Sequence, residues 1–364
     1  MAAKTAPSAT RVLNLHVDEA QWSEIQNAEC YSWTEQSSLV LPEDIVADLS
    51  AVYQHELRRC GVVHRHARWD YDIIELPIAD VLTHSGQVIA PNGKSLTPIS
   101  RNTARPALLR RGTMDGPVLS LLPPRLSRNY YHYLIEETVQ IRSILKRLFE
   151  DHPRIIGLVR RNPPAYEAQF RAALRSEFPG LELCEVGTGK RLTCSPLIAY
   201  RLKRNGPFRS PPSRDNLAHV VSTYLDAYAQ QVPKRGEYPL LVSRKDARIR
   251  KLINEDALFE RLQPFGAKRI TPGTLSHAEQ VAAFSKASVV IGTHGAGLTN
   301  LIFTPPATPV IEISGANYSQ GAYMWLCALT DRPHHRVITE LEGSHQNISL
   351  DERHLSTIET LVDQ

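Results

Sequence analysis

Cysteine is scarce in this chain, and its cysteines are not arranged for a zinc ribbon or a disulfide framework. There are five, an odd number, and they are scattered without C-x-x-C spacing: Cys30, Cys60, Cys184, Cys194 and Cys327. Secreted domains built on disulfides need closely spaced cysteine pairs, whereas cytoplasmic proteins keep their thiols reduced. We therefore expect a reducing compartment.

Long apolar runs are also missing. No stretch approaches the ~20 apolar residues that a membrane-spanning helix needs, and residues 1–10 lack the apolar core of a signal peptide. We expect a cytoplasmic protein, with peripheral contact to the inner membrane left open. Positive charge is in slight excess, 42 Lys and Arg against 38 Asp and Glu, for a net charge of +4. So small an excess does not predict nucleic-acid binding.

Two nucleotide-binding signatures are absent. The chain has no G-x-x-x-x-G-K-[ST] motif, and the glycines of its turn at 292–297 differ in spacing and position from the dinucleotide fingerprint. Neither a P-loop ATPase nor a dehydrogenase is predicted.

No spacing typical of a metal site stands out. Asp70-Tyr71-Asp72 has the Asp-x-Asp form that binds metal–nucleotide complexes in some sugar transferases, but so short a pattern arises by chance, and we interpret it as a turn before a strand. His64, His66 and the pair at 334–335 lack H-E-x-x-H or comparable spacing, which favours surface or strand histidines. We predict no metal site.

Length and periodicity predict a two-domain α/β protein. At ~100–200 residues per domain, 364 residues with 42% hydrophobic content suffice for two domains. Residues 1–125 predict only short strands and turns. The basic, proline-rich stretch at 201–214 is the best linker candidate, so we place an N-terminal α/β domain at 1–205 and a C-terminal domain at 206–364. Packing of the final helix against the N-terminal domain is left open.

Apolar periodicity places helices and strands in alternation after residue 128. In the first half we expect a helix, a strand, a helix and two strands at Asn129–Phe149, Arg154–Val159, Ala165–Phe178, Leu181–Val186 and Leu192–Tyr200. In the second half we expect helices at Asp215–Gln231, Asn254–Leu262 and Ser276–Ser285, and strands at Tyr238–Ser243, Ala267–Ile270, Ser288–Ile291 and Val310–Ile313. Ser276 and Glu279 fit a capping box. The second half predicts a doubly wound parallel sheet, with ligands beyond the carboxyl ends of its strands.

The most informative stretch is residues 288–313, which predicts a strand, a glycine-rich turn, a helix start and a further strand. Gly292, Gly295 and Gly297 lack side chains where the phosphates of a ligand can approach the backbone. The following helix would offer unpaired N–H groups and a partial positive charge. This site suits an anionic ligand.

Cations follow the predicted strand at 239–242. Arg244 comes directly at its carboxyl end, and Arg248 follows. Arginine grips phosphate oxygens bidentately, so this stretch, in the same domain as the glycine turn, can hold a diphosphate. The alternative is a solvated charged loop, which describes most basic runs.

A second candidate site lies on the helix predicted from residue 129. His132 and Glu136 are four residues apart and therefore neighbours on one helix face, so the carboxylate can orient the imidazole and raise its basicity. This makes His132 a candidate general base. The alternative is a packed, hydrogen-bonded histidine in an aromatic-rich helix start.

Three blocks in order resemble glycosyltransferase family 61. They are Asn129–Glu137, Ser243–Asp246 with Arg248 and Asn254-Glu255, and Gly292–Asn300, and together they span residues 127–314. Tyr133 stands where tryptophan is common in this family. Residues 1–125 carry no resemblance.

The resemblance implies a GT-B-like fold, in which two Rossmann-like domains face a cleft. It also implies an inverting glycosyltransferase that uses a nucleotide-diphosphate sugar, a glycan or glycoconjugate acceptor, and no metal or other cofactor. His132 would act as base, with Glu136 as the alternative. The donor would be held by the residues Arg244, Arg248, His294, Gly295, Ala296, Gly297, Asn300 and Glu312, the last on a ribose hydroxyl or as a cap of the neighbouring loop.

Other classes of function remain open. They are a non-catalytic nucleotide-sugar-binding module, a transferase of another group that uses the same anion-binding turn, and a polyanion-binding role for residues 201–214. The sugar, the linkage and the oligomeric state do not follow from the sequence.

Overall fold

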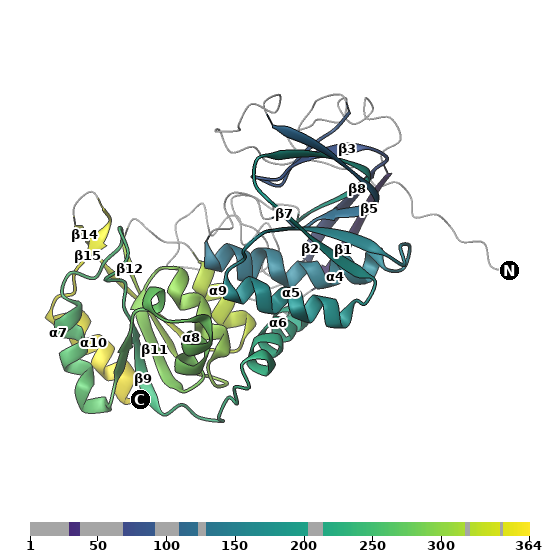
Figure 1. Cartoon of the computed structure of the whole chain (residues 1–364). Coiled ribbons are helices and arrows are strands. Elements are labelled where there is room, and N and C mark those ends of the chain that lie inside the picture. Colours follow the sequence, from purple (N-terminus) through teal and green to yellow (C-terminus); the bar gives the residue numbers. More distant parts are fainter. Residues whose placement is uncertain are drawn as a thin grey trace. The chain divides into compact units, whose positions relative to one another are not determined.

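The computed structural model describes residues 29–36, 68–91, 109–122, 129–202, 214–316, 321–342 and 345–364 (Figure 1). Contacts group them into two compact units, one ending at Asn216 and one running from Leu217 to Gln364. Each unit has its own sheet and hydrophobic core. Most of the predicted linker, and also His64 and His66, lie outside the described residues.

The first unit is built on an eight-stranded mixed sheet. Its strands are β1 (Glu29–Gln36), β2 (Arg68–Leu76), β3 (Ala79–Leu82), β4 (Gln87–Ile89), β5 (Arg110–Ser120), β6 (Ile155–Arg160), β7 (Leu181–Val186) and β8 (Lys190–Leu202). The order is β1-β2-β8-β5-β6-β7, with β3 paired to β8 and to β4. The β8-β5-β6-β7 part is parallel, whereas β1 to β4 add antiparallel pairs. Only part of this sheet therefore has the parallel pairing of a Rossmann-like domain.

The Asp-x-Asp stretch lies inside a strand, so its interpretation as a turn before a strand is wrong. Asp70 and Asp72 belong to β2 and face Thr34 and Ser32 of β1 across an antiparallel ladder. Asp72 also lies opposite Arg201 of β8. Pairing on both sides of the strand outweighs the low β-propensity of aspartate.

The helix predicted at 129–149 forms, but it is not α-helical throughout. A π-helical segment, η3 (His132–Thr138), precedes α4 (Val139–Leu148). The hydroxyl of Thr138 donates to the carbonyl of Tyr133, five residues earlier, at 2.7 Å. The two helix types differ in hydrogen-bond register, which apolar spacing does not encode. The next helix, α5 (Ala165–Glu177), follows β6 as predicted.

The second unit contains the predicted doubly wound sheet. Its five strands are β9 (Tyr238–Val242), β10 (Lys268–Ile270), β11 (Ala287–Thr293), β12 (Val310–Gly315) and β13 (His334–Thr339). All its pairs are parallel, and the order is β10-β9-β11-β12-β13. The chain adds β10 on one side of β9 and then β11 on the other, so the direction of winding reverses between β9 and β11. In such sheets, ligands bind beyond the carboxyl ends of the strands at this switch point.

Helices cover both faces of this sheet (Figure 1). The helices α7 (Glu255–Leu262) and α10 (Glu352–Asp363) lie on one side, where their apolar side chains join those of β9, β11 and β12 in one core. The final helix is thus part of the second unit's core, and Arg261 of α7 pairs with Glu359 of α10 at 3.0 Å. On the other side lie α8 (His277–Phe284), the 3₁₀ helix η6 (Ala296–Phe303) and α9 (Ala322–Leu329).

The remaining elements are short or connect the two units. They are α6 (Arg214–Ala227), η4 (Gln263–Phe265), η5 (Pro272–Thr274), β14 (Leu341–Glu342) and β15 (Asn347–Ile348). The capping box predicted before α8 is present, because Ser276 and Glu279 exchange backbone and side-chain hydrogen bonds.

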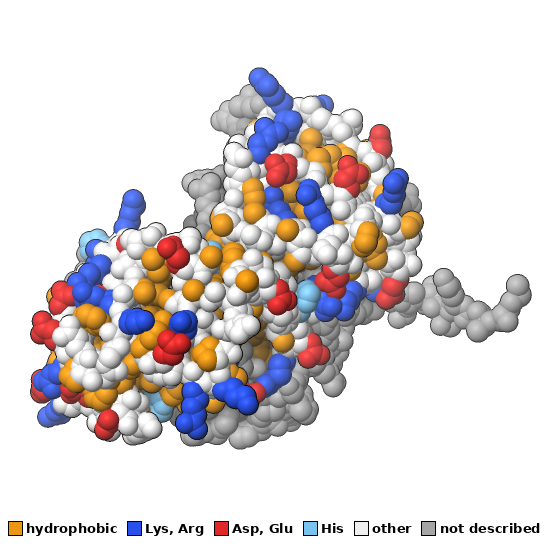
Figure 2. Space-filling view, turned by 60° about the horizontal axis from the view of Figure 1, so that its bottom comes forward, with side chains coloured by type: hydrophobic (Ala, Val, Ile, Leu, Met, Phe, Trp, Pro, Cys, Tyr) orange, Lys and Arg blue, Asp and Glu red, His pale blue; other side chains and the backbone are white. Residues whose placement is uncertain are grey.

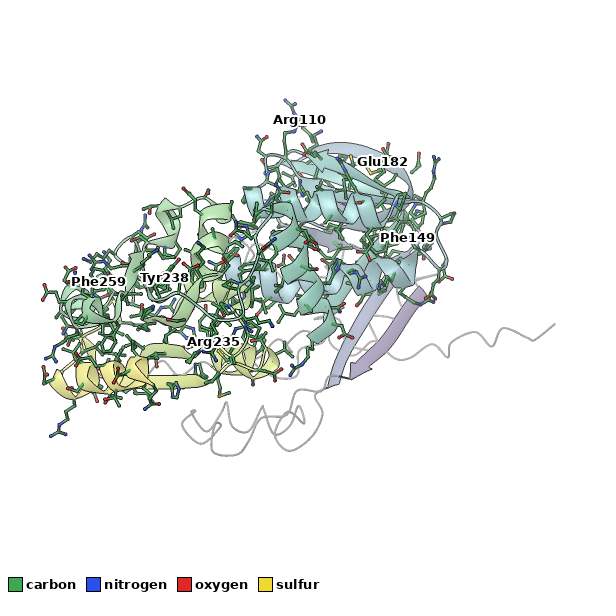
Figure 3. The ribbon with its side chains drawn as sticks, turned by 90° about the horizontal axis from the view of Figure 1, so that it is seen from below. Arg110, Phe149, Glu182, Arg235, Tyr238 and Phe259 are labelled. Atoms are coloured by element: carbon green, nitrogen blue, oxygen red, sulfur yellow. The ribbon has the colours of Figure 1, made fainter. Side chains whose placement is uncertain are left out.

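The edge strand β10 carries a cation toward each face of the sheet. Lys268 Nζ lies 3.9 Å from the ring centroid of Tyr238, and the Arg269 guanidinium lies 4.5 Å from that of Phe259. Both rings are labelled in Figure 3. Charged side chains on an edge strand discourage pairing with other chains.

Acidic and basic side chains are interspersed on the face shown in Figure 2. Among the described residues, no helix is both long enough and apolar enough to cross a membrane.

Candidate functional site

The switch point of the second unit carries Arg244, just after β9. Its Nε donates to the carbonyl of Arg250 at 3.3 Å and its Nη2 to that of Ile249 at 3.3 Å. The loop therefore folds around the guanidinium of its own first arginine. Arg250 has φ +58°, a conformation that is strained for a residue other than glycine, and its carbonyl also accepts from the Thr293 hydroxyl. The structure thus holds the Arg244 guanidinium in a fixed position.

The guanidinium of Arg244 lies against the glycine turn that follows β11. A side chain at Gly295 would place its Cβ 1.6 Å from Nη1 of Arg244. Only glycine permits this approach. The two predicted donor-site features, the cation after β9 and the turn after β11, are therefore in direct contact.

At the other two glycines of the turn, the missing side chains leave room for neighbouring residues, and the approach of a phosphate to their backbone stays a prediction. A Cβ at Gly292 would meet Val242 at 3.1 Å, and one at Gly297 would meet Pro272 at 3.1 Å. The missing side chains let neighbouring elements approach at the switch point.

The helix after the turn exposes backbone donors next to Arg244. The Leu298 N–H donates to the Gly295 carbonyl at 2.9 Å, the first bond of η6, so the N–H groups of Ala296 and Gly297 precede the helical ladder. Both residues are half-buried. Together with the arginine, these N–H groups suit a phosphate.

Asn300 is placed to support the turn. Its side chain is fully buried, and Nδ2 donates to Gln280 Oε1 at 2.9 Å and to the Gly297 carbonyl at 3.4 Å. Gln280 in turn donates to the carbonyls of Pro272 and Leu275. The amide therefore ties η6 to α8, and direct contact of Asn300 with a donor stays a prediction.

A buried chain of three side chains lies beside the turn. His294 Nδ1 bonds to Oε1 of Glu312, and His334 Nε2 bonds to Oε2 of the same carboxylate at 2.8 Å. The ring of His294 meets that of Tyr323 edge-on at 4.9 Å, and the Tyr323 hydroxyl donates to the Gly295 carbonyl at 2.5 Å. The chain thus joins β13 and β12 to the glycine turn.

The carboxylate of Glu312 is ionised despite full burial. Burial by itself raises the pKa of Glu312, but the charge and hydrogen bonds of His294 and His334 outweigh it and hold this pKa below its usual range. Both oxygens accept from histidines. In this arrangement Glu312 orients two imidazoles, and contact with a ribose hydroxyl stays a prediction.

Arg248 and Arg250 flank this site differently. Arg248 is exposed, and its side chain has no hydrogen bond or ion pair among the described residues. Arg250, together with His294 and Ser314, lines a pocket at the carboxyl ends of β11 and β12.

The predicted pair in the first unit also forms. His132 Nδ1 lies 2.8 Å from Glu136 Oε2, within the π-helical segment. The His132 side chain is 36% exposed and that of Glu136 only 10%, so the imidazole is the more accessible partner. Around it, Tyr131 meets the His132 ring edge-on at 5.5 Å. The carboxylate fixes Nδ1 as a donor, which leaves Nε2 of a neutral ring as a base.

Two residues of the second unit's site were not predicted to belong to it. The sequence predicts His334 as a surface or strand histidine, and it does lie in a strand, but buried against Glu312. Tyr323 lies in no motif, whereas Arg250 is one of the cations that follow the strand at 239–242. Predicting the contact of Glu312 with His334 would require knowing that β12 and β13 are neighbouring strands, because the two side chains meet only through that strand pairing. Among the described residues, no three His, Cys, Asp or Glu side chains are grouped as metal ligands.

Comparison with known proteins places the site in a family context. The family model described as Glycosyltransferase 61 matches residues 123–311, just over half of the chain. Beta-1,2-xylosyltransferase of Arabidopsis thaliana is 31% identical over 106 residues, which are 26% of this chain and 18% of that protein. EGF domain-specific O-linked N-acetylglucosamine transferase of Drosophila melanogaster is 27% identical over 164 residues, 41% of this chain and 31% of that protein. The chain spans less than a third of the length of these relatives.

Proposed function

The chain belongs to glycosyltransferase family 61, and from this membership and the geometry of the two sites we propose that it is an inverting glycosyltransferase. The donor is a nucleotide-diphosphate sugar, and the acceptor is a hydroxyl of a glycan or glycoconjugate. The two units form a GT-B arrangement in this proposal. The relatives named above carry two different sugars in their names, so membership of the family leaves the donor sugar open.

The observation that supports the donor site most strongly is the contact of Arg244 with Gly295. It brings a fixed guanidinium next to the first N–H groups of η6, at the switch point of a parallel sheet. In the reaction, these donors stabilise the charge that develops on the leaving diphosphate. Donors that are already in position need no reorganisation when the bond breaks.

His132 supplies the base in this proposal. Its Nε2 removes the proton of the acceptor hydroxyl while the hydroxyl oxygen attacks the anomeric carbon from the side opposite the diphosphate. Glu136 holds the ring through Nδ1 and stabilises the imidazolium that forms. A single displacement of this kind inverts the anomeric carbon.

The proposal is tested by following both substrates. A thermal-shift screen of UDP, GDP, CDP, ADP and dTDP identifies the nucleotide, because a ligand of the folded state raises the melting temperature. The matching nucleotide sugars are then offered with glycan acceptors, with and without EDTA. We expect transfer that EDTA leaves unchanged, and a product whose anomeric configuration, read by NMR, is opposite to that of the donor. Retention of configuration, or loss of transfer in EDTA, would contradict the mechanism.

A non-catalytic nucleotide-sugar-binding module is the second candidate. It predicts a thermal shift with a nucleotide sugar but no transfer to any acceptor and no hydrolysis. The accessible His132–Glu136 pair favours the enzyme, since a binding module has no need of a base.

A further inference from the structure

We propose that Thr138 is a positioning residue, which holds the His132–Glu136 pair in the orientation that the transfer reaction needs. The inference rests on the proposed function, since it takes His132 to be the base. Thr138 is the last residue of η3 and is fully buried, so its side chain has no access to a substrate. It acts through the winding of the helix.

The helix reaches the surface near its start only through the pair itself. His132 and Glu136 are partly exposed, whereas every other residue from Tyr131 to Ile141 is buried. The helix is therefore enclosed along this stretch, and the pair projects through the one face that is left open. Which residues occupy that face depends on how the backbone winds.

The π-helical winding of η3 determines which face the pair occupies. A π-helix bonds each N–H to the carbonyl five residues earlier, where an α-helix uses the carbonyl four residues earlier, so it takes up one residue more in the same turn. One residue corresponds to about 100° of rotation in an α-helix. The π-helical turn therefore rotates His132 and Glu136 by about 100° relative to the apolar face of α4. With α-helical winding throughout, the pair would project from a different side of the helix.

The Thr138 hydroxyl favours the π-helical winding. It donates to the Tyr133 carbonyl at 2.7 Å, across the same five residues that a π-helical backbone bond spans. In an α-helix, a threonine hydroxyl bonds to a carbonyl three or four residues earlier. Thr223 of α6 does so with the carbonyl of His219, at 2.8 Å. Loss of the Thr138 hydroxyl thus removes a bond that is matched to the π-helical register.

The orientation of the pair matters because a general base must come within hydrogen-bond reach of the proton that it removes. His132 Nδ1 lies 2.8 Å from Glu136 Oε2, which leaves Nε2 to meet the acceptor hydroxyl. A change of winding moves the ring away from this position. Displacement of a catalytic group by ~1 Å can cost about 10²-fold in rate.

Two substitutions at Thr138 test the hydroxyl. Thr138→Val removes it at nearly constant shape, and Thr138→Ser keeps it. We expect Thr138→Val to lower kcat by about 10- to 10²-fold with unchanged nucleotide affinity, and Thr138→Ser to keep most of the rate. Thr223→Val is the matched control, because it removes a hydroxyl bonded to a carbonyl in the α-helical register. Equal kcat in Thr138→Val and this control overturns the inference.

The same substitution in a second background separates positioning from a general loss of structure. Once His132→Asn has removed the imidazole, no base is left for Thr138 to position. Thr138→Val should therefore cost no further rate in the His132→Asn chain, so the two losses are not additive. A purely structural role predicts the same fold-loss in both backgrounds, and that result overturns the inference.

The tautomer of His132 gives a measurement that does not depend on transfer. In the full chain with ¹⁵N-labelled histidine, NMR distinguishes the two neutral ring forms, and the His132 signal is the one missing from His132→Asn. We expect the form with the proton on Nδ1 in the unmodified chain and in Thr138→Ser, and a mixture of both forms in Thr138→Val. An unchanged tautomer in Thr138→Val overturns the inference. Absence of transfer by the unmodified chain instead overturns the proposed function, and the inference with it.

Discussion

At the scale of single residues, Arg244 and Gly295 act as one unit. The arginine is held by two backbone carbonyls of its own loop, and the turn after β11 leaves room for it because residue 295 has no side chain. The glycine is needed for space and not for its backbone angles, since its φ of 173° is ordinary extended geometry.

Replacing Arg244 by alanine should weaken binding of the nucleoside diphosphate. Hydrogen bonds to charged groups contribute about 1.5–3 kcal/mol, which corresponds to roughly a 10- to 150-fold loss of affinity. Arg244→Lys keeps the charge but lacks the planar guanidinium, so its nucleotide affinity should lie between that of the unmodified chain and that of Arg244→Ala. Calorimetry measures both, with Arg353→Ala, an exposed arginine of α10, as a control for the loss of charge. Equal affinity in Arg244→Ala and the control would remove Arg244 from the phosphate site.

Gly295→Ala should reproduce the Arg244 defect without touching the arginine itself. The new Cβ would lie 1.6 Å from Nη1, so the guanidinium must move away from the turn. We expect a comparable loss of nucleotide affinity in the same calorimetric assay. Gly187→Ala is the matched control, because a Cβ there meets nothing within 4 Å. Wild-type affinity in Gly295→Ala would show that the guanidinium need not touch the turn to bind phosphate.

His132→Asn should leave nucleotide affinity unchanged and lower the rate of transfer. Asparagine keeps a donor for Glu136 but has no Nε2, and loss of a general base costs about 10²–10⁴-fold in turnover. Initial rates at saturating donor and acceptor measure the effect. Glu136→Gln should cost less, since Glu136 acts through the histidine. The reverse ranking would make Glu136 the base.

At the scale of elements, the positions of helices and strands could largely be predicted and their finer geometry could not. The strand at Leu181–Val186 and the helix start at Ala165 agree with prediction, because burial imposes its period on the sequence. The π-helical register of η3 and the pairing of Asp72 inside β2 depend on hydrogen bonds that leave no period in the sequence. The pairing of Glu312 with His334 escaped prediction for the same reason.

The helix α8 contributes a pH-dependent element of stability through His277. Burial lowers the pKa of His277 to about 4, against ~6.5 for an unfolded histidine. Between these values the unfolded chain binds more protons than the folded chain, so the free energy of unfolding falls as pH drops from ~6.5 to about 4. Above pH ~6.5 the contribution of His277 to stability is complete. In the unmodified chain, the Tyr228 hydroxyl lies 2.8 Å from Nδ1 of His277. The variant His277→Asn keeps an acceptor for this hydroxyl, and its side chain does not titrate.

The measurement is the free energy of unfolding in urea at pH 7 and pH 5. The unmodified chain should lose about 2 kcal/mol more than His277→Asn over this interval, by the ~1.36 kcal/mol that one pKa unit represents. Parallel losses in the two proteins would mean that His277 is protonated in the folded state at pH 5.

At the scale of the whole molecule, the chain divides its chemistry between two separately built units. The residues proposed to bind phosphate follow strands of the second unit's parallel sheet, whereas the His132–Glu136 pair comes from a helix of the first. In the sequence, the two motifs lie on opposite sides of the basic, proline-rich stretch. The mixed pairing of the first sheet is what sequence reasoning could not supply, since the residues before 125 carry no motif.

This division predicts where a nucleoside diphosphate slows hydrogen exchange. In the proposed site, the diphosphate lies against Arg244 and the glycine turn, so protection should appear in peptides that cover residues 243–250 and 293–298. Peptides from β6, α5 and β7 of the first unit should exchange as in the free chain, because their amides bond within that unit's own sheet and helix. The full chain is labelled with and without nucleotide and then digested, and mass spectrometry of the peptides measures both sets at once. Protection confined to the first unit would place the nucleotide on the side of His132 and reverse the assignment of donor and acceptor sites, whereas protection confined to the second unit leaves His132 free for the acceptor.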